Sequence, residues 1–201
     1  MKIIKLRPGR ERSLQKRHPW IFEGSIARGA ADAGETVRVE ADDGSFLAWA
    51  AFSPASQIRA RAWSFDEAER IDAALFERRI AAAVALRGRL AIDSDALRLI
   101  HGEADGLPGL IVDRYGDTLC AAFGSAGSER WKDTICSALL AATGCTRLYV
   151  RSDASVRVLE GLAPSTGWLR QPPGDSGATD VTIRETGWKL TVDVAHGHKT
   201  G

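Results

Sequence analysis

The chain has 201 residues, of which 44% are hydrophobic and 26% charged, and its formal net charge at pH 7 is +1. This balance is typical of a globular protein and argues against a disordered one. No apolar run approaches the roughly 20 residues that a membrane span requires, and no apolar segment follows the charges of the N-terminus, so we expect neither a membrane segment nor a secretory signal. The 3 cysteines are spaced irregularly, which favours reduced thiols in a cytoplasm over a disulfide framework or a zinc site.

The basic residues concentrate near the N-terminus. Residues 1–65 hold 11 Lys and Arg against 7 Asp and Glu, whereas the remainder of the chain holds 16 against 19. Ahead of His18, Glu11 is the one acid among the cations Lys2, Lys5, Arg7, Arg10, Arg12, Lys16 and Arg17. Such a cluster is typical of a protein that binds a polyanion. The alternative is a solvated face that keeps the protein soluble.

The pattern of the first 65 residues predicts short strands over 3–6, 20–27, 35–41, 46–53 and 58–65. A short helix is expected at or just after Pro8, and Asp42-Asp43-Gly44 is a hairpin signal. Five strands in this length predict a small closed or nearly closed β-barrel. In the last strand the alternation puts Arg59 and Arg61 on one face, where guanidinium groups at a spacing of two residues suit successive phosphates. An exposed strand that uses arginine for solubility is the alternative.

The composition changes at Asp66, which we expect to be the N-cap of a long helix ending near Ala91, and we place a domain boundary there. Beyond it the pattern predicts a strand over 98–104, a hairpin over 110–124 and a helix from Ser128 to Thr143. A strand over 148–153, a loop over 171–180 and a closing hairpin over 181–194 follow. This order of strand, strand, helix, strand, strand predicts an α+β fold.

Few residues suggest chemistry. His101, in HGEADGLPG, is a candidate ligand or base, but a lone histidine beside glycine favours a structural turn residue. The carboxylates Glu103, Asp105 and Asp113 are a weak signal for an acid–base pair. Cys120, Cys136 and Cys145 have apolar neighbours, which predicts inert buried thiols.

The C-terminal HGHKTG contains His196 and His198 at a spacing of two residues, with no acidic or thiol partner in the motif, so we expect no metal site. A loop that approaches an anionic or adenosyl ligand is one interpretation of this motif, and a flexible tail is the other. We identify no catalytic residue in the chain.

Five segments, in order, carry a resemblance to a known family: LRPGRERSLQKRHPWIFEGSI, SPASQIRARAWS, HGEADGLPGLIVDRYGD, RSDASVRVLEGL and VDVAHGHKTG. From about Lys5 to Gly201 the chain resembles the amino-terminal part of bacterial large-subunit (23S) ribosomal RNA cytosine-C5 methyltransferases. The resemblance implies a PUA-like RNA-binding β-barrel over residues 1–68. It also implies an EEHEE-type α+β domain with a leading helix over 69–190, and over 191–201 the start of a linker into an S-adenosylmethionine-binding methyltransferase domain.

On this resemblance we expect the RNA-recognition portion of an S-adenosylmethionine-dependent methyltransferase, cut before its catalytic domain, inactive by itself and not binding the cofactor alone. The expected partner is large-subunit ribosomal RNA in the cytoplasm, and a homodimer is possible. The segment that borders the cofactor site in the family matches Lys199, Thr200 and Gly201. The phosphate contacts we predict are Lys5, Arg7, Arg10, Arg12, Lys16, Arg17, Arg59 and Arg61, and Trp20 is expected in the core or stacked on a base.

Two other functions remain open at this point. One is a free-standing RNA-binding adaptor module without enzymatic activity. The other is an interaction domain that does not bind nucleic acid, in which the basic cluster is only a solvated face.

Overall fold

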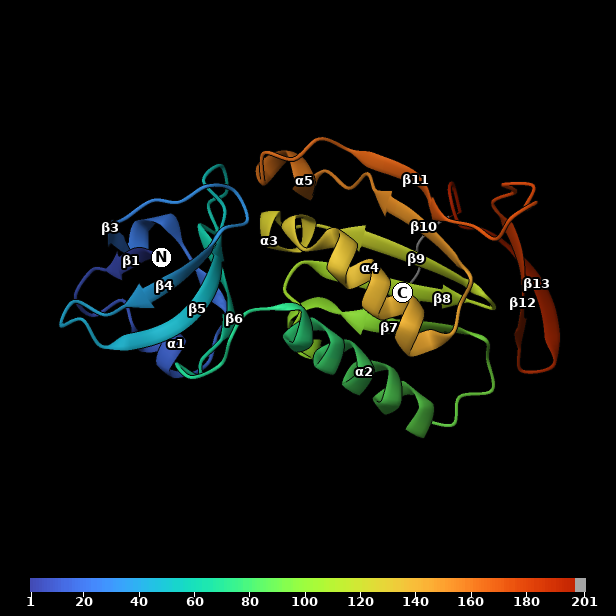
Figure 1. The fold of residues 1–201 in the computed structure, drawn as a ribbon, viewed down its shortest axis with the longest axis horizontal. Helices are drawn as coiled ribbons and strands as arrows, with labels where there is room; N and C mark the ends of the chain where they lie inside the picture. Colours follow the sequence, from blue (N-terminus) through green and yellow to red (C-terminus); the bar gives the residue numbers. More distant parts are fainter. Residues whose placement is uncertain (198–201) are drawn as a thin grey trace.

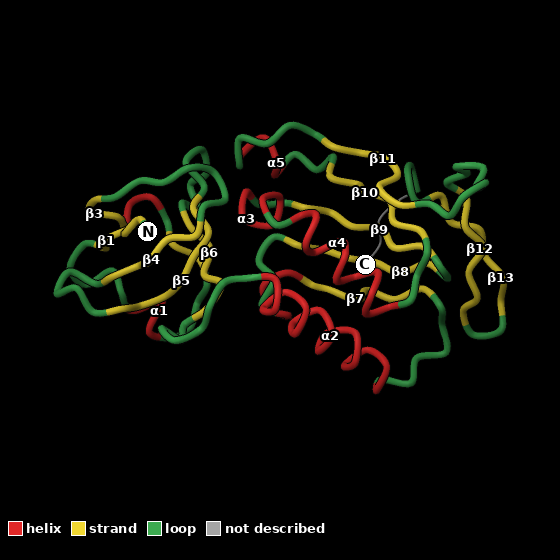
Figure 2. Tube along the Cα trace, viewed as in Figure 1, coloured by secondary structure: helices red, strands yellow, loops and turns green. Residues whose placement is uncertain are grey.

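The computed structural model describes residues 1–197 and shows two units side by side, an N-terminal barrel and a larger α+β unit (Figure 1). Helices lie on one face of the sheet of the α+β unit, and a separate hairpin lies at its far end (Figure 2). The segment between β6 (Ala60–Ser64) and α2 (Ala73–Arg89) joins the two units, as Figure 1 shows. A mixed α+β fold, as expected, is therefore present.

The barrel is one curled sheet of six strands in the order β2-β6-β5-β4-β1-β3. Strands β2 and β3 lie at the two ends of this order yet follow each other in the chain across a short 3-10 turn, η1 (Glu23–Ser25), so the two edges of the sheet are brought together. Its elements are β1 (Lys2–Leu6), α1 (Arg12–Gln15), β2 (Trp20–Ile21), β3 (Ile26–Arg28), β4 (Thr36–Glu40), β5 (Phe46–Phe52) and β6 (Ala60–Ser64). The predicted small barrel is therefore present as a curled sheet.

The single strand expected over 20–27 is wrong, because the chain changes partner in the middle of that stretch. Strand β2 pairs with β6, whereas β3 pairs with β1. The turn η1 between them redirects the backbone from one edge of the sheet to the other.

Strand β6 also differs from the prediction, because all five of its residues are buried. Ala60 and Ala62 belong to the core of the barrel, whereas Trp63 packs into the core of the α+β unit. The expected exposed face at Arg61 is therefore wrong: β6 lies between two cores, and Arg61 is only 7% exposed.

Helix α2 (Ala73–Arg89) starts later than predicted. Its N-cap is Asp72, whose Oδ1 accepts a hydrogen bond from the backbone N of Leu75 at 3.2 Å. Asp66 instead accepts one from the backbone N of Ala68 at 2.9 Å, within a turn. The expected N-cap at Asp66 is wrong, because either aspartate is a good cap and only the path of the connection decides between them.

The α+β unit is built on a five-stranded sheet in the order β11-β10-β9-β8-β7, in which β9 and β10 are parallel and the other pairs antiparallel. Three strands lie between α2 and the next two helices, and β11 ends the sheet, so the strand–strand–helix–strand–strand order is not confirmed in that form. The elements are β7 (Ala96–His101), η2 (Gly102–Asp105), β8 (Leu110–Tyr115), β9 (Thr118–Phe123), α3 (Ala126–Arg130), α4 (Lys132–Thr143), β10 (Arg147–Ser152), α5 (Val156–Leu159) and β11 (Ser165–Arg170).

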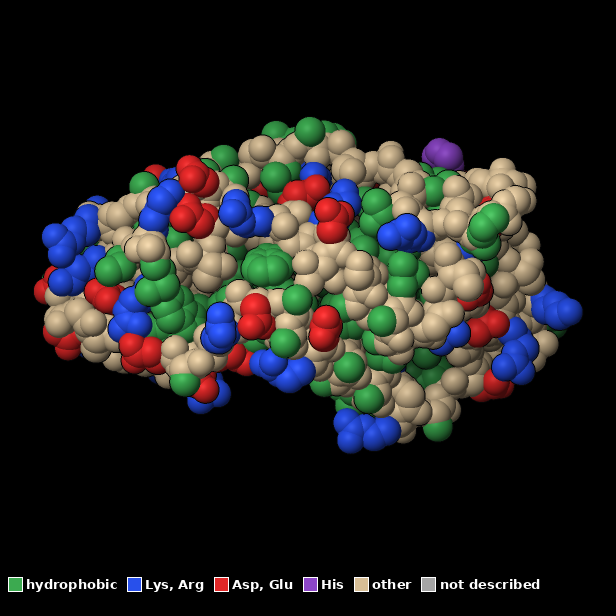
Figure 3. All heavy atoms as spheres, viewed as in Figure 1, with side chains coloured by type: hydrophobic (Ala, Val, Ile, Leu, Met, Phe, Trp, Pro, Cys, Tyr) green, Lys and Arg blue, Asp and Glu red, His purple; other side chains and the backbone are tan. Residues whose placement is uncertain are grey.

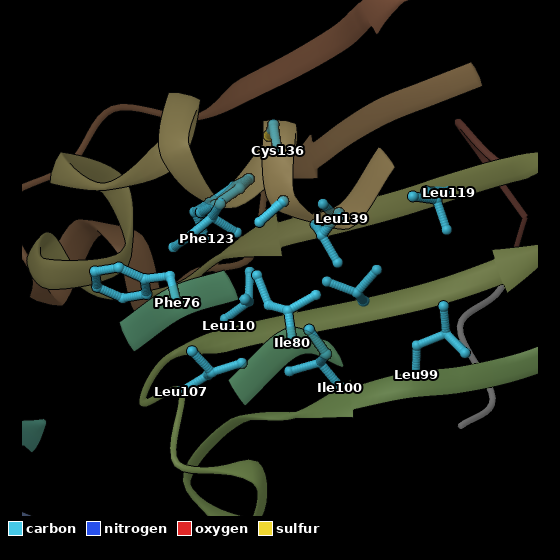
Figure 4. Packing of buried hydrophobic residues seen from close by; sticks show 14 of the residues in the cluster. Phe76, Ile80, Leu99, Ile100, Leu107, Leu110, Leu119, Phe123, Cys136 and Leu139 are labelled. Carbon is cyan, nitrogen blue, oxygen red and sulfur yellow. The ribbon is translucent and has the colours of Figure 1, made fainter. Parts of the chain in front are cut away.

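The two faces of this sheet bury different partners, because side chains alternate along a strand. Leu119 and Phe123 of β9 point to the helices, where they pack with residues such as Phe76 and Leu139 (Figure 4). Cys120, between them, points to the other face and packs against the closing hairpin of β12 (Asp180–Glu185) and β13 (Trp188–Asp193). The predicted closing hairpin is confirmed.

Candidate nucleic-acid interface

The eight predicted phosphate contacts do not form one surface. Arg7 and Arg59 line a common groove on the barrel, whereas Arg17 lines a separate cleft between the two units. Lys5 is half-buried on β1, and the exposed residues around α1 are Arg10, Arg12 and Lys16. Arg61 is buried. The structure therefore brings together two of the eight.

The groove shared by Arg7 and Arg59 holds a third arginine, Arg28, and we call it the arginine groove after these three residues. It has a volume of about 420 Å³ and is walled by β3, the loop after it and the end of β5. Arg7 Nε donates a hydrogen bond to the backbone O of Ile26 at 3.0 Å, which holds this side chain along β3. Arg59 pairs with Glu23 and donates to the backbone O of Pro54.

Gly29 lets the chain pass close to β1 at the edge of this groove. Its φ is +106°, and a Cβ there would collide with the backbone O of Ile3 and lie 3.0 Å from Ile4 Cα. Because only glycine tolerates both conditions, this position keeps Arg28 against the barrel wall.

Arg28 is the residue of the groove that sequence reasoning missed. It pairs in register with Lys5 across β1 and β3, so it places a second cation beside Lys5 at the edge of the sheet formed by β3. The tripeptide that contains it carries no signal by itself, and the partner change between β2 and β3 was needed to find it.

The charge of the arginine groove favours an anionic ligand. Three guanidinium groups line it against the single carboxylate of Glu23, which is 65% exposed. Planar guanidinium groups bind phosphate oxygens in a bidentate manner. Lys and Arg side chains, with acidic ones among them, cover the end of the molecule where β1 and β3 lie (Figure 3).

Arg61 takes part in a buried network that joins the two units. Its Nη1 lies 2.8 Å from an oxygen of Glu160, which is 2% exposed. The other Glu160 oxygen accepts from Ser53 Oγ at 2.8 Å and from the backbone N of Ala126 at 3.2 Å. The guanidinium of Arg61 therefore binds protein rather than facing solvent.

Three carboxylates that were considered for acid–base work have structural partners. Asp105 accepts two hydrogen bonds from Arg87, at 2.6 and 2.7 Å, and one from the backbone N of His101. Burial opposes its charge, but these hydrogen bonds outweigh burial and lower the pKa of Asp105. Asp113 pairs with Arg98 at 2.8 Å.

Glu103 accepts a hydrogen bond from Trp20 Nε1 at 2.8 Å, across the junction of the two units. Trp20 is half-buried at this junction rather than part of the barrel core. Trp20 is therefore neither buried in the barrel core nor freely exposed to stack on a base, so its position differs from both expectations.

All three cysteines are buried, and burial raises the pKa of the Cys136 thiol to about 12. Within residues 1–197 no group of three or more His, Cys, Asp or Glu is arranged to hold a metal ion. No helix in the same part of the chain is long and apolar enough to cross a membrane.

Near the C-terminus, His196 Nδ1 lies 3.0 Å from Asp193 Oδ2. The pKa of Asp193 is about 2, because hydrogen bonds from the backbone N of Ala195 and His196 outweigh the opposing effect of desolvation. His198 and the expected cofactor residues Lys199, Thr200 and Gly201 lie outside the described residues.

One comparison with known proteins matches the barrel alone, and others match nearly the whole chain. Residues 4–65 match the family model of the PUA-like domain. The chain is 47% identical over 203 residues to ribosomal RNA large subunit methyltransferase I of Shewanella frigidimarina, and 46% identical over 200 residues to the protein of the same name from Escherichia coli O139:H28. Each alignment covers 98% of this chain and 50% of the relative.

Solved structures share the fold. A candidate SAM-dependent methyltransferase from Streptococcus mutans superposes with a TM-score of 0.77 at 16% identity, covering 98% of this chain and 50% of that one. A candidate methyltransferase complexed with SAH superposes with a TM-score of 0.78, covering 98% and 49%. The chain thus spans about half the length of the curated relatives that it matches, 50% of each, and its barrel matches the PUA-like domain.

Proposed function

We propose that this chain binds large-subunit ribosomal RNA and serves its methylation at cytosine C5 from S-adenosylmethionine. The observation that carries the proposal is the 47% identity to a large-subunit ribosomal RNA methyltransferase over 98% of the chain. A PUA-like match over residues 4–65 supports RNA as the ligand of the barrel.

The arginine groove supports contact with the phosphate backbone, because phosphates dominate the affinity of most nucleic-acid-binding proteins. Arg7, Arg28 and Arg59 are the central contacts in this proposal. The positive electrostatic potential around these three residues is increased by the other predicted cations: Lys5, Arg10, Arg12, Lys16 and Arg17. The buried ion pair of Arg61 argues against a direct contact by that residue.

We also propose, on the family resemblance, that the barrel occupies residues 1–68 and that an EEHEE-type α+β domain occupies 69–190. The proposed linker over 191–201 overlaps the end of β13, which extends to Asp193. S-adenosylmethionine is the methyl donor of the reaction, and this chain alone binds none and is inactive. Calorimetric titration of S-adenosylmethionine into the 201-residue chain should therefore give no heat of binding, and a measurable affinity would contradict this part.

A ribosomal RNA substrate implies a cytoplasmic location, where thiols such as those of Cys120, Cys136 and Cys145 stay reduced. A homodimer stays a prediction. Sedimentation equilibrium tests it, because it gives the molar mass of the protein in solution.

The experiment that tests RNA binding is a titration with single-stranded segments of large-subunit ribosomal RNA over a range of salt concentrations. If about five phosphates are neutralised, the slope of log K against log salt should be about −3.5. The double variant Arg7→Ala, Arg28→Ala should weaken this binding. Its control is Arg184→Gln, because this exposed arginine lies on β12 at the opposite end of the molecule from β1 and β3 (Figure 1). A slope near zero, or an equal loss in the control, would overturn the proposal.

A further inference from the structure

The junction of the two units contains a cleft that is separate from the arginine groove. We call it the junction cleft; it has a volume of about 620 Å³ and is lined by residues of both units. Pockets of roughly 300–1,000 Å³ are typical of sites for small ligands or single chemical groups. On the face drawn in Figure 3, basic and acidic side chains lie next to each other on both sides of the junction.

The walls of the cleft are flat and apolar in part. Pro19 and Phe65 come from the barrel side, and Pro108 comes from the loop that follows η2. Walls of this kind suit a planar ring, because unstacked bases pack on aromatic and other apolar side chains.

The charge of the lining differs from that of the arginine groove. Two cations, Arg17 and Arg79, meet three acids in the junction cleft: Asp66, Glu69 and Glu103. Arg79 is neutralised by Glu69 at 3.1 Å. A lining with more acids than bases disfavours a run of phosphates but offers acceptors to a ligand that carries N–H donors.

Glu103 is the acceptor best placed for such a donor. One of its oxygens, Oε1, accepts from Trp20 Nε1 at 2.8 Å, which orients the carboxylate across the junction. A carboxylate has room for further hydrogen bonds. Carboxylates are the side chains that accept from the amino group of cytosine.

The cleft is formed before any ligand binds. Arg79 Nη1 donates to the backbone O of Trp63 and to that of Gly106, both at 2.6 Å, and so ties the barrel to the loop of the α+β unit. The buried pair of Arg61 and Glu160 joins the same two units at a second point. Because both sets of contacts lie within the protein, the walls of the cleft are in place without a ligand.

Arg17 adds a cation to the cleft, and its backbone is unusual. Its φ is +60°, in the left-handed region that glycine prefers, at the end of α1. Arg17 lines the cleft, and a cation there suits the phosphate that adjoins a bound base.

We propose that the junction cleft takes one unstacked, amino-bearing nucleobase of the RNA, with Glu103 accepting from its amino group and Arg17 contacting the adjoining phosphate. This inference rests on the proposed RNA binding and adds a preference for base type. Cytosine fits the acceptor, whereas uracil, which has a carbonyl oxygen in place of the amino group, does not.

The test compares the hexanucleotides C6 and U6 by fluorescence anisotropy, since the two bases have the same ring size. The chain should bind C6 about tenfold more tightly than U6. Glu103→Gln should bring the two affinities within about twofold of each other, because an amide offers both a donor and an acceptor. Its oxygen still accepts from Trp20, so the melting temperature should be unchanged, and the control Arg184→Gln should keep the preference.

Arg17→Gly provides an independent variant that folds, because glycine suits the left-handed backbone of this position. It should weaken C6 and U6 equally and reduce the salt slope by about 0.7. Equal binding of C6 and U6 by the unmodified chain, with the steep salt slope intact, would overturn this inference alone. Loss of the salt-dependent binding itself would instead overturn the proposed function.

Discussion

The arginine groove and the junction cleft lie in one molecule but are built in different ways. Residues of the barrel alone form the groove, which combines three arginines with the single acid Glu23. Both units form the cleft, which combines two cations with three acids. This difference indicates that a lining with more cations than acids suits phosphates, whereas one with more acids than cations suits the hydrogen-bond donors of bases.

The ion pairs of the groove and of the junction differ in their exposure to solvent. Arg59 pairs with Glu23, whose side chain is 65% exposed against 17% for Arg59, so solvent reaches this pair from the side of the glutamate. Arg61 pairs with Glu160, whose side chain is 1% exposed, so this pair serves the junction. Exposed pairs contribute roughly 0–1 kcal/mol, whereas breaking a buried one costs several times more.

The largest expected effect is that of Glu160→Ala. Removing this carboxylate strands the buried charge of Arg61 and two further donors, so the free energy of unfolding should fall by about 3–5 kcal/mol. Glu23→Ala, the exposed counterpart, should change it by less than about 1 kcal/mol. Urea titration of the two variants measures both values, and equal losses would break the comparison.

Gly127→Ala should disturb the junction but not the groove. A Cβ at this position of α3 would collide with Ala51 Cβ and approach the ring of Trp63 to 2.9 Å, so it pushes the barrel away from the α+β unit. We expect a loss of about 1–3 kcal/mol together with loss of the preference for C6 over U6. Gly88→Ala is the matched control, because its Cβ meets nothing within 4 Å and alanine favours a helix. A preserved base preference in Gly127→Ala would show that the cleft does not depend on the junction.

The double variant Arg7→Ala, Arg28→Ala should disturb the arginine groove but not the junction cleft. Loss of two phosphate contacts should reduce the salt slope by about 1.4 and weaken binding of C6 and U6 by about tenfold alike, since each lost contact is worth about 0.5–1 kcal/mol. The base preference should stay, because Glu103 is untouched. The measurement is the same anisotropy titration at several salt concentrations, and a change in the ratio of the two affinities would contradict the separation of roles.

The last prediction concerns Asp105, which lies in η2 together with Glu103. Because its pKa is lowered in the folded chain, its ionised form stabilises the fold above the ordinary value of 3.8, and this contribution is lost as the pH falls through the lowered pKa. The difference in unfolding free energy between the unmodified chain and Asp105→Asn should therefore stay constant from pH 7 to pH 5 and shrink below about pH 3.8. A difference that instead shrinks between pH 7 and pH 5 would contradict the sign of the shift.

The local patterns of the sequence predicted much of the fold. Alternation in the first 65 residues predicted the barrel strands, and the apolar spacing after Asp66 predicted a long helix. Gly116 and Gly187 mark two hairpin turns that the structure contains. Strand β11 was missed, because its sequence, STGWLR, is mostly polar and half-exposed at the edge of the sheet.

What the sequence by itself determined is the set of local periods and the basic N-terminal cluster, since both depend on neighbours along the chain. Which of the cations share a groove was decided only by the tertiary structure. Arg7, Arg28 and Arg59 meet because β2 and β3, which are adjacent in the chain, form the two opposite edges of the barrel sheet. Arg61 is buried because β6 lies between two cores. Strand pairing and domain packing join residues far apart in the chain, and no local spacing encodes them.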